Sequence, residues 1–155
     1  MKEASLYEQL EMYRYSLGIA ISDVTEEEAN IIPKGFNNNI RWNVGHVLVS
    51  TDAMILTMAG FPSTLPEEWG QYFMRGTSPQ NFTDETPTLA ELQEASQEQM
   101  RKLRALVEGK LDTPLANPFE LPKTTIYTSG DGLTFCMFHE GLHMGQIQGI
   151  RKLVK

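Results

Sequence analysis

The sequence predicts an all-α protein, a four-helix bundle with long crossover connections. Four segments carry apolar residues at the three- and four-residue spacing of an amphipathic helix. Two proline-rich stretches, at 61–87 and 112–130, separate the second long helix from the third and the third from the fourth. The length of 155 residues, with 41% apolar and aromatic residues, fits a single domain over residues 1–155.

The first helix is predicted from Leu6 to Ile21, because its apolar residues recur at spacings of four and three. The following Thr25-Glu26-Glu27-Glu28 has the pattern of a capping box, which opens a short helical turn before Pro33. The chain then passes through a turn-rich connector over residues 34–39, where any of three asparagines can cap the next helix.

The second long helix is predicted over 40–59 and ends at Gly60-Phe61-Pro62. Apolar residues cover most of its circumference, so we expect it to pack on several sides and to hold His46 in the interior. The stretch 61–87 contains four prolines and several aromatic residues. We expect a short helix near 67–74 and otherwise a crossover, which shapes one wall of a site or covers one end of the bundle.

Thr88 and Glu91 form a second capping-box pattern, at the start of a third long helix that ends at Gly109. After three further prolines, the β-prone residues 124–128 are predicted to be extended or to form a small ribbon. The last helix is predicted to begin near 129–131 and to continue to about Val154.

Composition and charge exclude several functions. A net charge of −7 and the lack of a basic stripe argue against nucleic-acid binding. No apolar run reaches the length of a membrane span, so no membrane partner is expected. The single cysteine, Cys136, cannot form an internal disulfide, and the acidic N-terminus is not a signal peptide, so we expect a cytoplasmic protein.

Two of the three histidines, His139 and His143, stand four residues apart in the last helix. Both imidazoles therefore leave the same helical face and can bind one metal ion. His46 taken alone fits a hydrogen-bonded core histidine, but the pair favours a site of three histidines for a divalent metal. Three neutral ligands leave coordination positions open for water or substrate, as in catalytic metal sites.

Helical geometry extends the candidate site along the last helix. At about 100° per residue, Gln146 and Cys136 lie about 40° from the direction of the histidine pair and Glu140 about 80°. We therefore expect Gln146 to face inward as a catalytic candidate. Glu140, at the edge of the face, is a candidate proton carrier or a salt-bridged residue. Cys136 fits a packing residue better than a fourth ligand.

Polar residues also follow His46 on its own helix. Asn43 and Ser50 share its direction within an otherwise apolar helix, so either is a candidate to hold the second imidazole nitrogen of His46. Further along the last helix, Arg151 is a candidate to bind an anionic cofactor, with a surface role as the alternative.

The pattern His139-Glu140-x-x-His143 also matches the metalloprotease signature, in which the glutamate is the general base. That family takes its third ligand from downstream. The twelve residues after His143 contain no His, Asp, Glu or Cys, so peptidase activity is not expected.

A longer resemblance rests on Asn39-Ile-Arg-Trp-Asn-Val-Gly-His46 together with His139-x-x-x-His143-x-Gly-Gln-Ile147. These motifs, and the order of the predicted helices over nearly the whole chain, resemble the DinB-like (YfiT-like) superfamily. The resemblance implies a four-helix bundle with a divalent ion, nickel or zinc, on His46, His139 and His143. It also implies a homodimer. Characterised relatives include bacillithiol- and mycothiol-dependent S-transferases and a mycothiol-dependent maleylpyruvate isomerase.

The leading hypothesis for function is an S-transferase, in which the metal binds a small bacillithiol-type thiol as thiolate and directs it at a small-molecule electrophile. One alternative is a metal-dependent hydrolase, in which metal-activated water attacks an ester or amide. The other is a non-enzymatic, stress-related protein that binds the metal without turnover.

Overall fold

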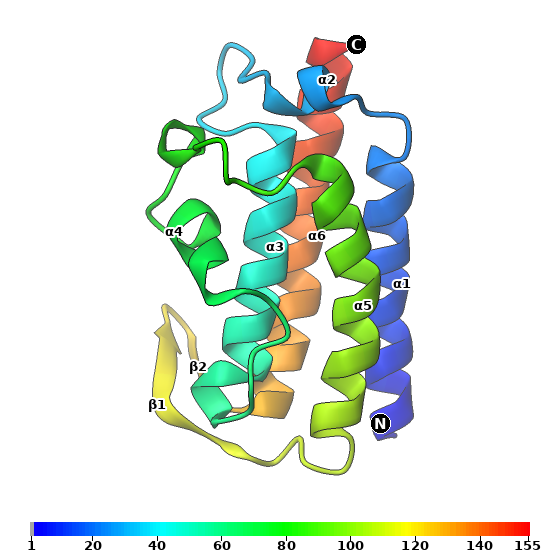
Figure 1. The fold of residues 1–155 in the computed structure, drawn as a ribbon. Coiled ribbons are helices and arrows are strands. Elements are labelled where there is room, and N and C mark those ends of the chain that lie inside the picture. The colour runs from blue at the N-terminus through cyan, green and yellow to red at the C-terminus, as the bar shows by residue number, and fades with distance from the viewer. Residues whose placement is uncertain (1) are drawn as a thin grey trace.

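The computed structural model describes residues 2–155, which are mostly helical, so the predicted all-α class is confirmed at this level (Figure 1). The four long helices are α1 (Glu3–Ile21), α3 (Ile40–Ile55), α5 (Leu89–Val107) and α6 (Ser129–Val154). The short helices are α2 (Glu26–Asn30) and α4 (Gly70–Phe73), with single 3-10 turns at Thr57–Ala59, Glu67–Trp69 and Pro79–Asn81. Strands β1 (Pro114–Leu121) and β2 (Thr124–Thr128) pair antiparallel as a hairpin.

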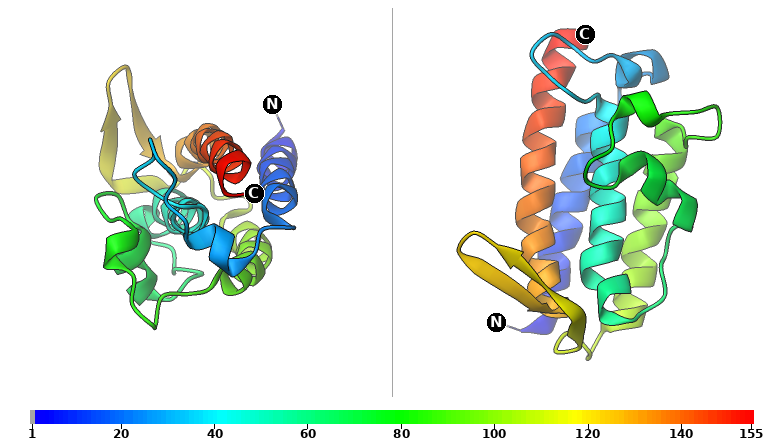
Figure 2. Two further views of the ribbon diagram at one scale, coloured as in Figure 1. Left: turned by 90° about the horizontal axis from the view of Figure 1, so that it is seen from above. Right: turned by 90° about the vertical axis from the view of Figure 1, so that its left-hand side faces the viewer.

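The four long helices lie side by side and occupy the corners of a square when seen from above (Figure 2). α6 packs beside α3 and α1, and α5 packs beside the same two helices from the other corner. α1 and α6 run in one direction, whereas α3 and α5 run in the opposite one (Figure 1). The neighbours α3 and α5 run in parallel and cannot be joined by a short turn, so a long crossover connects them.

Local sequence signals set the helix starts. The capping boxes predicted at Thr25 and Thr88 are both present, and Thr128 forms a third with Asp131 at the start of α6. The side chain of Asn39 caps α3 by accepting a hydrogen bond from the backbone N–H of Trp42. Each cap supplies an acceptor to a backbone N–H that has no partner within its own helix.

α3 and α6 approach closely near one end of the molecule. A Cβ added at Gly132 of α6 would lie 2.2 Å from the carbonyl oxygen of Met54 on α3, so only glycine fits there. Buried aliphatic and aromatic side chains from all four long helices fill the interior around this contact. The tight α3–α6 pairing fixes the separation of the two helices that carry the histidines.

The structure corrects two predicted elements. α3 ends at Ile55 rather than near residue 59, and the last predicted turn is a separate 3-10 turn, Thr57–Ala59. The ribbon predicted at 124–128 was given no partner strand, and the structure supplies β1, which contains Pro114 and Pro118 and forms a two-stranded hairpin in which each strand has a free edge. Proline is tolerated on such edge strands, where its missing N–H has no ladder to break.

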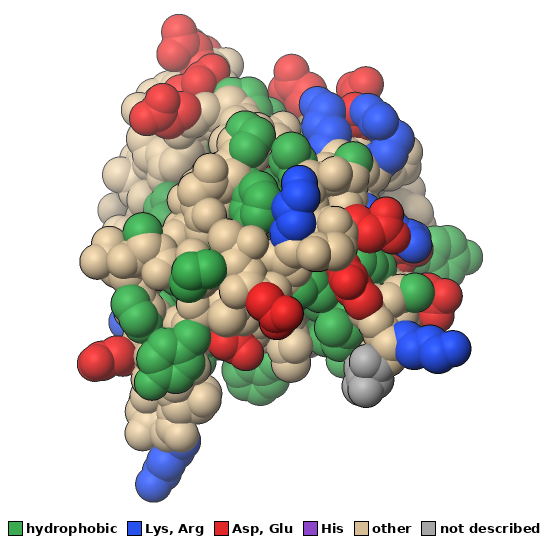
Figure 3. All heavy atoms as spheres, turned by 90° about the horizontal axis from the view of Figure 1, so that it is seen from below, with side chains coloured by type: hydrophobic (Ala, Val, Ile, Leu, Met, Phe, Trp, Pro, Cys, Tyr) green, Lys and Arg blue, Asp and Glu red, His purple; other side chains and the backbone are tan. Residues whose placement is uncertain are grey.

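The hairpin projects from the end of the molecule that holds the start of α6 (Figure 2). This end shows separate acidic, basic and apolar side chains and no histidine (Figure 3). Among residues 2–155, no helix is both long and apolar enough to cross a membrane.

Candidate metal centre

The three histidines predicted to share a site lie together between α3 and α6. One ring nitrogen from each of His46, His139 and His143 falls within 4.8 Å of the others. The Nε2 atoms of His139 and His143 are 3.2 Å apart, and the ring centroid of His46 is 5.0 Å from that of His139 and 4.8 Å from that of His143. Such a set of imidazole nitrogens fits a divalent metal ion.

Hydrogen bonds on the far side of two rings fix their orientation. Nδ1 of His46 donates to the carbonyl oxygen of Phe73 over 2.6 Å, and Nδ1 of His143 donates to Oδ1 of Asn43 over 2.7 Å. A proton on Nδ1 leaves Nε2 as an unprotonated acceptor. Both rings are thereby oriented with an unprotonated Nε2.

The amide of Asn43 is itself held in place. Its Nδ2 donates to the backbone carbonyl of Asn39 over 2.8 Å, so its oxygen is the atom that faces His143. Asn39 is also the residue that caps α3. In the first turn of α3, the residue that caps the helix therefore also positions Asn43, the hydrogen-bond partner of His143. The sequence predicted that Asn43 holds His46, whereas the structure assigns it to His143.

The crossover supplies the support of His46, through the backbone of Phe73. Phe73 is fully buried, and its ring lies directly on Gly45, where an added Cβ would come within 2.3 Å of the ring atom Cδ1. Only glycine at position 45 allows this approach, which brings the Phe73 carbonyl to the imidazole. The crossover thus contributes to the site, one of the two roles expected for it.

Aromatic rings flank the cluster on two sides. Trp42 stacks on His46, with ring centroids 4.5 Å apart and an angle of 10° between planes, and its Nε1 donates to Oγ1 of Thr77. Phe135 stacks on His139, with centroids 5.6 Å apart and an angle of 24°. Each stack shields one face of an imidazole from water, together with part of the apolar surface of the aromatic ring.

Burial keeps the three histidines neutral. Desolvation lowers the pKa of His46. Burial, and then the charge of a neighbouring imidazole, lowers the pKa of His139 to about 4 and that of His143 to about 3. At neutral pH the cluster therefore offers uncharged nitrogens to a cation, with no proton to displace from the buried rings.

Ser50, the second candidate to support His46, lies on the other side of the ring. Its Oγ is 3.4 Å from Nε2 of His46, the nitrogen that faces the cluster. Its hydroxyl is therefore placed beside the metal-binding nitrogen rather than behind it, where it can donate to a group bound at the centre.

The helical geometry predicted Glu140 at the edge of the site, and the structure shows that this is wrong. Its side chain is 1% exposed, and it forms an ion pair with Arg14 of α1, with Nε to Oε1 at 2.9 Å. The salt-bridged alternative therefore holds, and the carboxylate is not available to carry protons at the histidines.

A buried polar network, which the sequence did not reveal, surrounds this ion pair. Arg14 also donates to Oε1 of Gln99 on α5 and to the hydroxyl of Thr51 on α3, and Gln99 donates to Oδ1 of Asp52. Asp52 in turn accepts hydrogen bonds from Ser63 and Thr64, at the start of the crossover. The network joins all four long helices. A signal was present, because Arg14 falls on the apolar stripe of α1, between Leu10 and Leu17.

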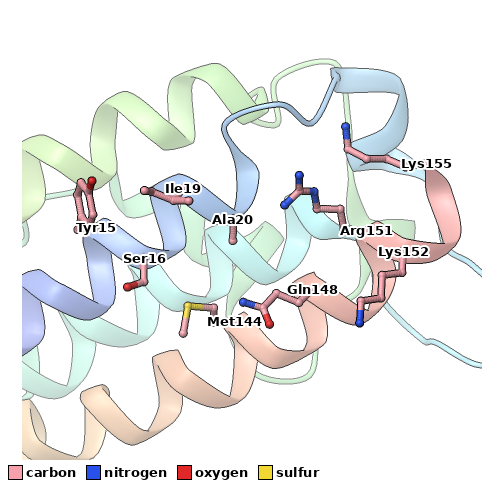
Figure 4. Close-up of a pocket in the computed structure, with 9 residues that line it drawn as sticks. All are labelled: Tyr15, Ser16, Ile19, Ala20, Met144, Gln148, Arg151, Lys152 and Lys155. Carbon is pink, nitrogen blue, oxygen red and sulfur yellow. The ribbon is translucent and has the colours of Figure 1, made fainter.

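The remaining candidates are Gln146 and Arg151. Gln146 is exposed, so the expectation that it faces inward is wrong. Arg151 donates to Oδ2 of Asp23 over 2.7 Å and lines a groove of about 760 Å³ between α1 and α6, beside Lys152 and Lys155 (Figure 4). The structure therefore supports the surface alternative for Arg151.

Cys136 is buried and is not part of the three-histidine cluster within the described residues. Burial, followed by the nearby charge of Glu140, raises the pKa of its thiol to about 12. A neutral thiol in this position fits the packing role predicted for it.

The chemistry of the site follows from what contacts the histidines. Their hydrogen-bond and ring partners are an asparagine, a serine hydroxyl, a backbone carbonyl and aromatic rings, and none is charged. A divalent ion held by three neutral imidazoles keeps its full charge and attracts an anionic ligand. The donor set therefore fits a divalent metal ion.

Comparison with known proteins concerns the fold and the family of the chain. No curated protein matches the chain. The chain is similar to the crystal structure of a conserved protein from Enterococcus faecalis, at 17% sequence identity and a TM-score of 0.67, over 99% of this chain and 98% of that one. At this identity the similarity concerns the fold alone. The family model of the DinB superfamily matches residues 9–147, most of the sequence, and the chain therefore belongs to the DinB superfamily.

Proposed function

We propose that this protein is a metal-dependent S-transferase, in which a nickel or zinc ion on His46, His139 and His143 binds a small thiol for attack on an electrophile. One observation carries the proposal: the three imidazoles converge in a site whose hydrogen-bond partners, among the described residues, include no carboxylate and no amine. None of these partners is a general base, so we infer a nucleophile that loses its proton on binding the metal.

The bound metal supplies a positive charge that favours the thiolate over the thiol. The thiol proton passes to solvent, the sulfur lone pair forms the new bond to carbon, and the leaving group departs with its electron pair. In this scheme Asn43 and the Phe73 carbonyl keep two imidazoles unprotonated at Nε2. Trp42 and Phe135 exclude water, and Ser50 donates a hydrogen bond to the nucleophile.

The resemblance to bacillithiol- and mycothiol-dependent relatives supports a bacillithiol-type thiol as the co-substrate. Arg151 has no part in this scheme, because it is paired with Asp23 in a groove on another face of α6. We propose that the metal–sulfur bond, rather than a cluster of cations, provides most of the affinity for the thiol. We also infer that the four long helices form the four-helix bundle that the resemblance implies.

The test is turnover by metal-loaded protein. Purified protein is analysed for bound metal, loaded with zinc or nickel, and assayed with a panel of thiols and 1-chloro-2,4-dinitrobenzene. The expected result is a thiol-dependent rate that is lost in His46→Ala. A rate equal to that of His46→Ala for every thiol would remove the transferase proposal.

The same experiment separates the alternatives. Hydrolysis of an ester without added thiol, lost in His46→Ala, would favour the metal-dependent hydrolase. A melting temperature that rises with metal, with no turnover of any substrate, would favour the non-enzymatic metal-binding protein.

We further propose a homodimer that uses the groove between α1 and α6 (Figure 4). Tyr15 and Ile19, which line it, are 71% and 55% exposed. Acidic residues are exposed on the N-terminal half of α1, whereas lysines lie at the C-terminal end of the parallel α6. A two-fold axis across the groove would place the acidic half of each copy against the basic end of the other.

Sedimentation analysis tests the dimer. Tyr15→Asp is expected to give a monomer, while Tyr127→Asp, at a tyrosine that is 58% exposed on the hairpin, leaves the wild-type mass unchanged. A wild-type protein that sediments as a monomer at all concentrations would rule out the dimer.

A further inference from the structure

We infer that the metal centre is built to accept a substrate with a flat apolar group, which binds on a wall of phenylalanine rings leading from solvent to His139. This inference rests on the proposed function, since it takes the metal as the anchor of the reacting molecule. It adds the chemical class of the part of the substrate that does not contact the metal.

The wall is a continuous series of aromatic contacts. Phe135 stacks on the imidazole of His139, and the ring of Phe135 is in turn 6.4 Å from that of Phe138 and 6.3 Å from that of Phe119, centroid to centroid. These distances fall in the range of favourable aromatic pairs. The three rings, named here the phenylalanine wall, connect the metal ligand on α6 with strand β1 of the hairpin.

The outer end of the wall is open to solvent. Phe138 is 61% exposed, Leu142 on the next turn of α6 is 51% exposed, and Phe135 is half-buried between Phe138 and His139. The face of α6 between these apolar side chains and the histidines carries no charged residue, because positions 135, 138, 139, 142, 143 and 146 are all uncharged. A substrate that approaches His139 along this face meets apolar surface and no charged residue of α6 at these positions.

The surrounding elements are placed to hold such a group. The hairpin lies beside the N-terminal half of α6 and the crossover lies beside α3, both on the same side of the molecule (Figure 2). From the α3 side, Trp42 adds a second aromatic ring against His46 and lies 6.2 Å from His143. Rings therefore flank the metal centre on both helices, an arrangement suited to stacking on an aromatic or conjugated substrate.

A pair of simple thiols tests the wall by binding rather than by turnover. The protein is loaded with cobalt(II), and benzyl mercaptan or ethanethiol is titrated while the sulfur-to-cobalt charge-transfer absorption is followed. The two thiols differ in the phenyl ring and in acidity, so their affinities are compared after correction for the solution pKa of each thiol. We expect benzyl mercaptan to bind about tenfold more tightly, since a stacked ring adds one favourable aromatic contact.

Variants locate the source of this preference. Phe138→Ala removes an exposed ring and is expected to lower the preference at least about threefold, and the milder Phe135→Leu to lower it as well. Leu153→Ala is the matched control, because Leu153 is 60% exposed on α6, beyond the histidines, and its loss should leave the preference unchanged.

The outcomes distinguish this inference from the proposal on which it rests. If neither thiol produces the charge-transfer band in protein that binds cobalt, the thiol-transferase proposal fails. If both thiols bind with equal affinity, or if the preference survives in both phenylalanine variants, the wall does not bind substrate and this inference fails alone. It also fails if Phe138→Ala changes only the oligomeric state, because a second copy of the chain then covers the ring.

Discussion

His139, Glu140 and His143 are close neighbours in sequence, yet the structure places them in two different polar clusters on two faces of α6. The histidines meet His46 in a cluster of neutral imidazoles. Glu140 meets Arg14 in a buried network that reaches all four long helices. In the network, each donor of the guanidinium lies within reach of an acceptor on another helix. In the histidine cluster, the Nε2 atoms of His139 and His143 lie 3.2 Å apart, and a ring nitrogen of His46 lies within 4.8 Å of a nitrogen on each.

This difference separates a structural role from a ligand-binding role. A network whose donors and acceptors are satisfied within the protein holds helices together and offers no free group to a ligand. A cluster of convergent acceptors costs free energy to bury and recovers it when a cation is bound. The comparison therefore predicts that changes in the two clusters affect different measurements.

The largest expected effect is on metal affinity. His143→Ala removes one of three ligands together with the ring that contacts His139, and metal binding at micromolar concentration should be lost, a weakening of about a thousandfold or more. Isothermal titration with zinc measures this. The free energy of unfolding of the metal-free variant should stay close to that of the wild type. If the variant binds zinc as the wild type does, the assignment of the metal centre is wrong.

The second effect is on stability. Glu140→Ala leaves the buried Arg14 without its partner and should lower the free energy of unfolding by about 3–5 kcal/mol. Urea denaturation measures the loss, and the folded fraction should still bind zinc. As a control, the double variant Arg14→Met with Glu140→Met removes both charges and should recover most of the stability. A single variant as stable as the wild type would contradict the structural role.

Asn43→Ala tests the support of the metal ligand and should have a smaller effect on affinity. His143 loses the acceptor for its Nδ1 proton, so zinc affinity should fall about 10- to 100-fold. Ser50→Ala, at the hydroxyl beside Nε2 of His46, should change zinc affinity less, because that group supports no ring orientation. Equal losses in both variants would remove the distinction between the two positions.

The smallest effect concerns the metal-free protein in mildly acidic solution. The folded pKa values, about 4 for His139 and about 3 for His143, lie below the ordinary value of 6.5. Between these limits the unfolded state binds protons that the folded state does not, so stability is retained above pH 6.5 and falls as the pH decreases. Urea denaturation at pH 7.0 and 5.5 should show this loss before carboxyl groups titrate. The double variant His139→Ala with His143→Ala should show a weaker loss.

Much of the fold was predictable because its signals are local. The capping boxes at Thr25 and Thr88 and the periodic apolar residues indicated most helix boundaries. The hairpin was only half predicted, since proline hides an edge strand such as β1 from propensity arguments.

The candidate site was predictable where it depends on spacing and uncertain where it depends on packing. The histidine pair and its partner His46 followed from sequence and from the resemblance. Gln146 and Glu140 were misplaced because the direction of the histidines was taken as the direction of the interior. Burial shows that the interior lies toward Glu140 and Cys136, on one side of the histidines, and that solvent lies toward Gln146.

His46 and His143 differ in how substitutions can change the orientation and basicity of the imidazole. His143 depends on a side chain, so one substitution at position 43 alters its orientation and basicity. His46 depends on the main chain of the crossover, and every amino acid at position 73 carries the same carbonyl acceptor. The sequence of the crossover can therefore drift, provided that its backbone path is kept. Insertions and deletions in the crossover, rather than substitutions, are therefore the changes that would alter the orientation of the His46 imidazole and with it the chemistry of the site.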